Sequence, residues 1–446
     1  MSKSESPALK RSIGLWSAVA INVGAIIGGG IFVVTGIVAG YAGSALILSM
    51  IFAGIIAFLT ATSIAKLTAW QPVEGGVYEY GRQLISPYAG FLAGWMWLVA
   101  NTFTGAAVSL GFAAYLASAI PGVPTSIVAA IMCLVFTGLN VVGAKQSASV
   151  NNLFVGIKLA ILAFFVIFGV FSINISNFAP FTPVSSGVLY ATFFIFFAYG
   201  GFARVSVVAE EIKDAKRNVP RALLLSLGIS MIVYVLVGLV AVGLLGADGL
   251  SVSQSPLSSA IMVTGSSLAV QLVAIGGLVA TASVLLTAIL GVSRMAYSMA
   301  RRKDLPTSLT MLHSKFHTPS YAIVGTGVLM AVLVLFVDLN RVVAVSTFAL
   351  VLTYCITNIS AYKLKNRNQR WRYLPLVALV TCIMLLVFVL FATPQAWFIG
   401  VLFVIAGSIY YVVRRHWQKR VLANDTNNLP TNPDVGLTDA HKSCLI

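Results

Sequence analysis

The sequence predicts an all-α polytopic membrane protein with twelve transmembrane helices, in which the first and sixth helices are broken. Of its 446 residues, 59% are hydrophobic and 9% are charged, whereas about 25% of residues are charged in soluble domains. Apolar runs of about 20 residues recur along the chain, and each could cross a bilayer as a helix. Two of these runs are interrupted by glycines. This composition excludes a soluble multidomain enzyme.

The predicted spans follow a polar segment, residues 1–11, in which we expect no cleavable signal peptide. Residues 421–446 form a polar tail with two prolines, which we expect to be disordered. Between these segments the spans cover residues 12–40 (broken), 43–67, 88–118, 125–144, 149–172, 187–212 (broken), 222–246, 267–299, 320–338, 341–363, 374–393 and 396–414.

Lysine and arginine gather in every second loop, for example in residues 213–221 and 363–372. Such an asymmetry places the basic loops and both termini in the cytoplasm of a cell whose plasma membrane holds the protein. It also explains the net charge of +16 without a nucleic-acid partner. The partner that this pattern predicts is the lipid bilayer.

The first span contains a glycine-rich break in the stretch NVGAIIGGGIFVVTG, residues 22–36. Gly28, Gly29 and Gly30 each weaken a helix by about 1 kcal/mol relative to alanine. Unwound backbone at membrane depth is tolerated only where protein or a polar cavity satisfies its N–H and C=O groups. The break therefore indicates a place where backbone groups bind a solute. The alternative is close packing of helices on small residues.

The sixth span has a second break in FFIFFAYGGFARV, residues 193–205, at Gly200 and Gly201. Broken helices at corresponding positions of two halves are typical of transporters built from inverted repeats. The repeats would comprise spans 1–5, residues 12–172, and spans 6–10, residues 187–363, with residues 374–414 outside them.

The breaks also predict the chemistry of the ligand. Free N–H groups at Gly28, Gly29 and Gly30 favour a carboxylate, and free carbonyls at the first half-helices favour an ammonium group. A ligand with both groups on adjacent atoms is an α-amino acid. Phe197 and Phe202 flank the second break and could cover the solute as a gate, or could simply pack. The carbonyl candidates are Ala25, Ile26, Phe197, Ala198 and Gly200, with Gly201 completing the second break.

Lys158 lies about nine residues from the cytoplasmic end of the fifth span. With the rise per residue of a helix, this is a depth of about 13 Å. A lysine at this depth is costly unless it is paired or lies in a polar cavity. It could exchange a proton during transport, or stand in place of a bound cation beside the first break. Snorkelling to the surface is the alternative. Ser283 in the eighth span is the expected partner, although helical hydroxyls such as that of Thr281 often bond only to their own helix.

Three further polar residues are weaker candidates. Arg204 closely follows the second break, and it either lines the cytoplasmic vestibule or pairs with Glu210 or Glu211. Asn101 and Thr104 share one face of the third span. The cysteines lie singly and the histidines fall in loops or the tail, so we expect no metal, no cofactor and no catalytic residues. The alternative from another class is a membrane sensor or an enzyme acting on polar headgroups. It would need a catalytic cluster or a soluble domain, and the sequence offers neither.

Four stretches of the sequence resemble the amino acid–polyamine–organocation superfamily of permeases. They are GAIIGGGIFVVTG (24–36), PVEGGVYEYGRQLISPYAGFLAGW (72–95), FFAYGGFARVSVVAEEIKDAKRNVPRAL (196–223) and GVSRMAYSMARRKDLP (291–306). The resemblance implies the inverted-repeat fold of sodium-coupled neurotransmitter transporters, with an amino acid between helices 1 and 6 and alternating access. It also implies a gating aromatic at Phe197. Lysine at position 158 implies sodium independence, with the amine beside helix 1 and Ser283. Homodimers occur among members of this superfamily.

One departure concerns the substrate. Many members carry an acidic residue directly after the GF of helix 6, where this chain has Ala203 and Arg204. The departure argues against cationic substrates and favours a neutral or broadly accepted amino acid. We therefore predict a sodium-independent, proton-coupled secondary active amino acid transporter; an exchanger for amino acids or amines without proton movement is the alternative.

Overall fold

The computed structural model describes residues 13–73, 75–142, 144–207, 209, 212–316, 318–364 and 372–427. Within these ranges the elements are helices joined by loops, together with a single backbone pairing between Ile13 and Ile212. Ten apolar helical stretches are long enough to cross a membrane. The longest, Leu15–Trp70, makes two passes, and the 17-residue helix Ser320–Phe336 is only slightly shorter. Counted in this way, the described residues contain the twelve predicted spans.

The first pass consists of two half-helices, α1 (Leu15–Ile26) and α2 (Gly29–Ala42), which precede α3 (Leu46–Trp70). The sixth pass is α8 (Ser186–Tyr199), a 3₁₀ turn over Gly200–Ala203 and the short α9 (Arg204–Val207). The other elements are α4 (Val77–Leu84), α5 (Pro87–Ala119), α6 (Thr125–Val142), α7 (Ala144–Gly169), α10 (Ala215–Ser251), α11 (Pro256–Met262), α12 (Ser267–Arg301), α13 (Ser320–Phe336), α14 (Leu339–Lys363), α15 (Leu374–Ala392) and α16 (Pro394–Asn427).

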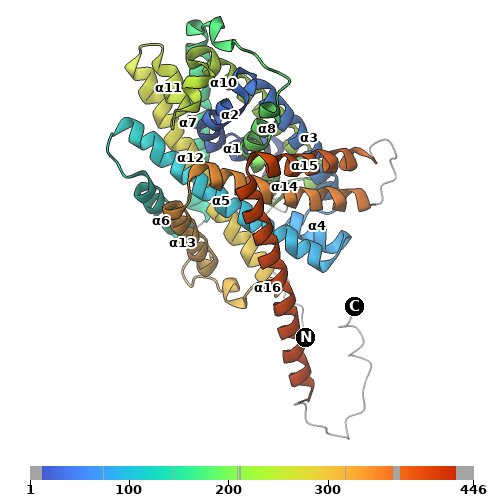
Figure 1. Cartoon of the computed structure of the whole chain (residues 1–446). Helices are drawn as coiled ribbons and strands as arrows, with labels where there is room; N and C mark the ends of the chain where they lie inside the picture. Colours follow the sequence, from blue (N-terminus) through green and yellow to red (C-terminus); the bar gives the residue numbers. More distant parts are fainter. Residues whose placement is uncertain are drawn as a thin grey trace, which may run out of the picture.

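The last helix differs from its predicted bounds. It extends to Asn427 rather than ending near residue 414, and it projects beyond the rest of the bundle (Figure 1). Residues 421–427, predicted to be disordered, are helical, because Val421, Leu422 and Ala423 allow the helix to continue without a breaker. Residues 428–446 of that tail lie outside the described residues.

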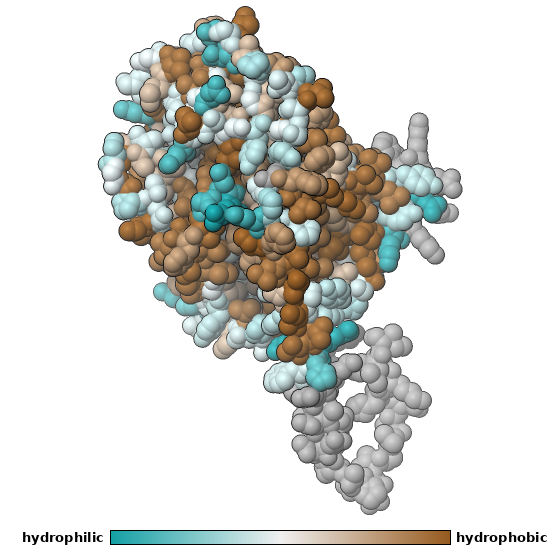
Figure 2. All heavy atoms as spheres, viewed as in Figure 1, coloured by the Kyte–Doolittle hydropathy of each residue, from teal (hydrophilic) through white to brown (hydrophobic). Residues whose placement is uncertain are grey.

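The broken helices lie inside the bundle. The half-helix α2 packs against α8, and α1 packs against α10, while α5 is held between α12 and α14. The pairs α6–α13 and α15–α16 lie at the flanks (Figure 1). Apolar side chains cover the flank formed by α15 and α16 (Figure 2), including the exposed Val387, Phe391 and Leu402. This arrangement exposes apolar helices to lipid and keeps both breaks away from it.

The two ends of the bundle differ in charge. We call the end that carries α4, the residues after α12 and the end of α16 the basic face, because the lysine- and arginine-rich loops lie there. The opposite end carries the loops that connect α5 to α6, α10 to α11 and α13 to α14.

Candidate functional site

The first break is a short extended segment between two half-helices. Ile27 has φ −73° and ψ 91°, and Gly28 has φ −140° and ψ −153°, so neither residue continues α1. The N–H of Ile27 donates to Val23 O at 2.8 Å and closes the end of α1. No side chain caps the N-terminus of α2. The first N–H groups of α2 therefore lack helical acceptors, as the glycine run predicts.

The second break is tighter than the sequence predicts. The chain narrows into a 3₁₀ turn over Gly200–Ala203 and resumes an α-helix at Arg204. The N–H of Gly200 donates to Phe197 O. The Phe197 carbonyl therefore already accepts one hydrogen bond, because a 3₁₀ turn keeps i→i+3 hydrogen bonds that a fully unwound segment loses.

Glycines allow the two breaks to touch. A Cβ atom built on Gly201 would lie 2.0 Å from Ala25 O, and one built on Gly30 would lie 2.6 Å from Ala198 Cα. Both obstacles are backbone atoms, which cannot rotate away as a side chain can. These two glycines therefore have a packing role as well as a conformational one.

Two buried tyrosines, missed by the sequence reasoning, bind carbonyls at the breaks. The Tyr234 hydroxyl lies 2.7 Å from Ile26 O and 2.9 Å from Ala198 O, and so connects one break to the other. The Tyr354 hydroxyl donates to Gly200 O at 3.2 Å. Each carbonyl keeps a second lone pair for a ligand. A phenol in an apolar span could have been noticed, since a buried Tyr hydroxyl normally finds a partner.

A small cavity of about 20 Å³ lies where the breaks meet. Its volume is that of roughly one water molecule, so the site is closed around too little space for an amino acid. Seven of the predicted residues line it, together with the weaker candidates Asn101 and Thr104 and with Arg204, Val108, Val284 and Leu350; the seven are Ala25, Ile26, Gly30, Phe197, Ala198, Gly200 and Gly201.

Of the residues predicted to bind the substrate or to act as a gate, three do not line the cavity. Gly28 and Gly29 begin α2 and approach α12, where added Cβ atoms would meet Val284 and Thr281. Phe202 is fully buried against the ring of Tyr354, with centroids 5.0 Å apart. Its predicted role as a second gate therefore does not fit this arrangement: Phe197 and Phe202 are five positions apart and lie on different faces of the chain.

Lys158 joins three helices beside the first break. Its side chain is fully buried, and Nζ donates to Gly24 O at 2.6 Å and to Ser283 Oγ at 3.1 Å. The lysine thus brings α7 into contact with the end of α1 and the middle of α12. Snorkelling to the surface is excluded in this structure, because the amine points into the bundle and has two partners there.

Arg204 contacts α12 one helical turn further along than Lys158 does. Its Nη1 donates to Thr287 Oγ1 at 2.5 Å, and Thr287 follows Ser283 by four residues. The arginine also lines the small cavity. Of the two alternatives for Arg204, the structure supports a place beside the cavity; Glu210 and Glu211 lie outside the described residues.

A second, larger cavity of about 420 Å³ opens on the end opposite the basic face. We call it the vestibule. Val33 and Leu110 line it, whereas Gly30 and Val108 on the same two helices line the small cavity. These residues are two or three positions apart, so about one helical turn separates the vestibule from the small cavity.

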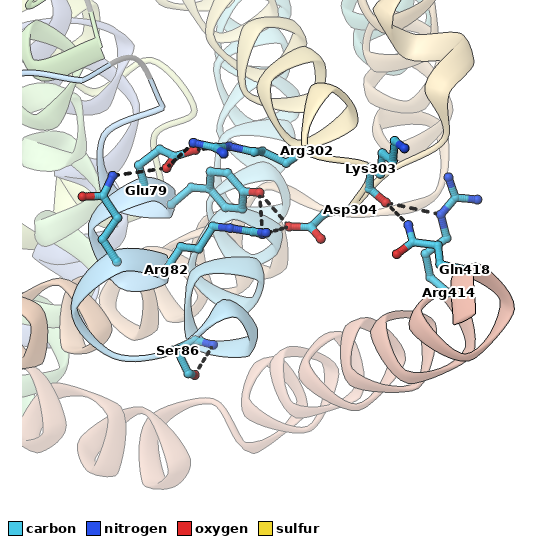
Figure 3. A network of polar contacts seen from close by, with 11 residues as sticks. Glu79, Arg82, Ser86, Arg302, Lys303, Asp304, Arg414 and Gln418 are labelled. Carbon is cyan, nitrogen blue, oxygen red and sulfur yellow. Dashed lines mark hydrogen bonds and ion pairs between the residues drawn. The ribbon is translucent and has the colours of Figure 1, made fainter. Parts of the chain in front are cut away.

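Ion pairs connect α4 to the end of α12 at the basic face (Figure 3). Arg302 binds both carboxylate oxygens of Glu79, at 3.0 and 3.2 Å. Arg82 and the Tyr78 hydroxyl bind Asp304 Oδ2 at 2.8 and 2.6 Å. Burial and then the hydrogen bond to Asp304 raise the pKa of the Tyr78 phenol, so that it remains a donor. We call these five residues the α4–α12 latch.

Relatives of the chain point in the same direction as this geometry. The pattern of the amino acid permease family matches residues 13–414. An uncharacterized transporter of Mycobacterium tuberculosis is 35% identical over 94% of this chain and 95% of its own length. The methylthioribose transporter of Bacillus subtilis is 28% identical, over 93% of this chain and 96% of its own length.

The branched-chain amino acid permease BcaP of Bacillus subtilis is 26% identical, over 81% of this chain and 82% of its own length. The family match includes both broken helices, Lys158 and the α4–α12 latch. The chain is therefore a multi-pass membrane transporter and belongs to the amino acid permease family of the amino acid–polyamine–organocation superfamily.

Proposed function

We propose that this protein is a sodium-independent transporter that moves α-amino acids across the plasma membrane with protons. Its basic face would lie in the cytoplasm and its vestibule outside. The observation that carries the proposal is the Lys158 amine, which binds Gly24 O at the end of α1 and Ser283 Oγ on α12. While it is protonated, the amine at this point can take the place of a bound sodium ion.

The substrate would bind where the two breaks meet. The uncapped N-terminus of α2 attracts the α-carboxylate, since its N–H groups and helix dipole favour an anion. Carbonyls of Ala25, Ile26 and Ala198 are the acceptors for the α-ammonium group. Phe197 lines the same cavity and is the proposed gate. Because the cavity is closed in this structure, substrate entry requires the surrounding helices to separate.

The amine of Lys158 would couple protons to that movement. When it carries a proton, it holds Gly24 O and so fixes α1 against α7 and α12. Loss of the proton weakens both hydrogen bonds, since a charged donor binds about twice as strongly as a neutral one. The half-helix α1 could then move away and open the cytoplasmic side. The vestibule on one side and the α4–α12 latch on the other support an outward-facing starting state.

Uptake into proteoliposomes tests this function. Labelled amino acids are supplied in sodium-free buffer, with and without an inward proton gradient; methylthioribose is included because one relative is named for it. We expect amino acid uptake that the gradient stimulates. Uptake that ignores the gradient but requires amino acid inside the vesicles would instead identify an exchanger, in which Lys158 stays charged. Uptake of methylthioribose alone would contradict the amino acid assignment.

A further inference from the structure

Among the residues that the structure describes, Arg204 has no carboxylate partner. It lines the cavity between the breaks and donates to the neutral hydroxyl of Thr287. In the part of the chain that the structure describes, the ion pairs are Arg82–Asp304, Glu79–Arg302 and Arg341–Asp338, and none involves Arg204.

A second cation lies close to it. Lys158 binds Ser283 and Arg204 binds Thr287, and these hydroxyls are four residues apart on α12. The two acceptor residues are about 6 Å apart along the axis of α12, so the two donors approach neighbouring turns of that helix. A cation inside the bundle is costly unless an opposite charge or a polar cavity compensates it. Two cations beside one cavity favour an anionic ligand and repel a cationic one.

The α-carboxylate of an amino acid cannot by itself place a negative charge beside Arg204. Its proposed binding groups are at the start of α2, which runs from the break towards the vestibule. Arg204 begins α9, on the other side of the second break, where the chain runs towards the basic face. A ligand that satisfies both places carries two anionic groups separated by a short chain.

We propose that the substrates are amino acids with an acidic side chain, and that Arg204 binds the side-chain carboxylate. This inference rests on the proposed function and names its substrate class. An arginine suits the role because its planar guanidinium can bind a carboxylate through two parallel hydrogen bonds. Substrate binding would place a carboxylate beside Arg204. Lysine and arginine would be rejected by charge repulsion.

Competition between acids and their amides tests the proposal. Uptake of glutamate and aspartate is compared with uptake of glutamine and asparagine, which have nearly the same shape without the charge. In the unmodified protein we expect the acids to be preferred by at least about tenfold, as for sites built around one polar group of the substrate. In Arg204→Gln this preference should disappear because glutamate uptake falls while glutamine uptake remains.

Arg372→Gln is the matched control, because Arg372 is an exposed arginine remote from the cavity, and it should keep the preference for acids. Equal loss of acid and amide uptake in Arg204→Gln would overturn the proposal, since Arg204 would then bind the α-carboxylate. A preference for neutral amino acids in the unmodified protein would also overturn it, yet leave the proposed function intact. Absence of uptake for every amino acid would contradict both. The comparison in the unmodified protein stands even if Arg204→Gln does not fold.

Discussion

The carbonyl groups released at the two breaks have specific partners, residue by residue. The Lys158 amine donates to Gly24 O, and the Tyr354 hydroxyl donates to Gly200 O. The single proton of the Tyr234 hydroxyl is shared between Ile26 O and Ala198 O. A carbonyl without a partner would be costly inside a membrane protein. These hydrogen bonds therefore satisfy four carbonyls at the breaks without a ligand.

The positions of the breaks and the pair Lys158–Ser283 can be predicted from the sequence. The contacts of the two tyrosines with the breaks cannot. Glycine runs and a buried lysine are visible in a sequence because they conflict with an apolar helix. The sequence does not show whether Tyr234 and Tyr354 lie on the inner side of their helices, because a helix that is apolar all round has no periodicity to reveal its orientation. The position of Phe202 could not be predicted for the same reason.

Gly201→Ala should abolish transport. The added methyl group would lie 2.0 Å from Ala25 O, so the two breaks would have to separate. Overpacking of this kind costs about 1–3 kcal/mol. We expect a lower melting temperature in detergent, measured by size-exclusion chromatography after heating, and loss of amino acid uptake into proteoliposomes.

Gly228→Ala is the control for Gly201→Ala, because nothing lies within 4 Å of a Cβ atom built on Gly228. It should leave both the melting temperature and uptake unchanged. Full uptake by Gly201→Ala would show that the two breaks need not approach closely in the transport cycle.

At the scale of elements, the α4–α12 latch connects a short amphipathic helix to the end of a membrane span. Glu79 is 7% exposed on its side chain, whereas Arg302 is 54% exposed. Removing one partner of this ion pair therefore has a different effect from removing the other. Removing Arg302 leaves a nearly buried carboxylate without its bidentate partner, while removing Glu79 leaves an arginine that water can solvate.

Glu79→Arg should reduce both stability and transport, because it places two arginines where a carboxylate and an arginine now pair. The new arginine would stand where the present side chain is only 7% exposed, beside Arg302 and without a carboxylate partner, and an unsatisfied buried group costs about 1–3 kcal/mol. The double variant Glu79→Arg with Arg302→Glu restores opposite charges and should recover part of the melting temperature and of the uptake rate. A double variant no better than Glu79→Arg would mean that the pair does not connect α4 to α12 in the functioning protein.

Element boundaries also separate what a sequence reveals from what it hides. The span order and the first break follow from apolar runs and glycines, and the structure agrees with them. The 3₁₀ turn at Gly200–Ala203 was not predictable, because Gly-Gly permits an extended break and a tight turn equally well. Contacts with α1 and α14 decide between them, and those contacts are tertiary.

Across the whole molecule, the proposed function requires the vestibule and the basic face to lie on opposite sides of the membrane. Gln254 lines the vestibule, and Lys363 ends α14 at the basic face. Cysteines placed at these positions report their sides. A Cys444→Ser background removes the cysteine of the tail, and Cys133, Cys355 and Cys382 are buried.

A membrane-impermeant maleimide added to intact cells should label Gln254→Cys and leave Lys363→Cys unlabelled. Lys363→Cys should react only after the membrane is opened. The unsubstituted background protein gives the unspecific signal. Labelling of Lys363→Cys in intact cells would reverse the proposed orientation, and with it the direction of transport.

In the proposed function, the Lys158 amine couples protons to amino acid transport. The most direct test of this coupling is gradient-driven uptake in sodium-free proteoliposomes by the unmodified protein, by Lys158→Met and by the control Lys363→Met, which removes an exposed lysine. Methionine fills the space of the lysine stem but cannot carry a proton. We predict that an inward proton gradient stimulates uptake by the unmodified protein and by Lys363→Met, and that Lys158→Met shows no stimulation. Gradient-stimulated uptake by Lys158→Met would contradict the proposed role of the Lys158 amine in proton coupling.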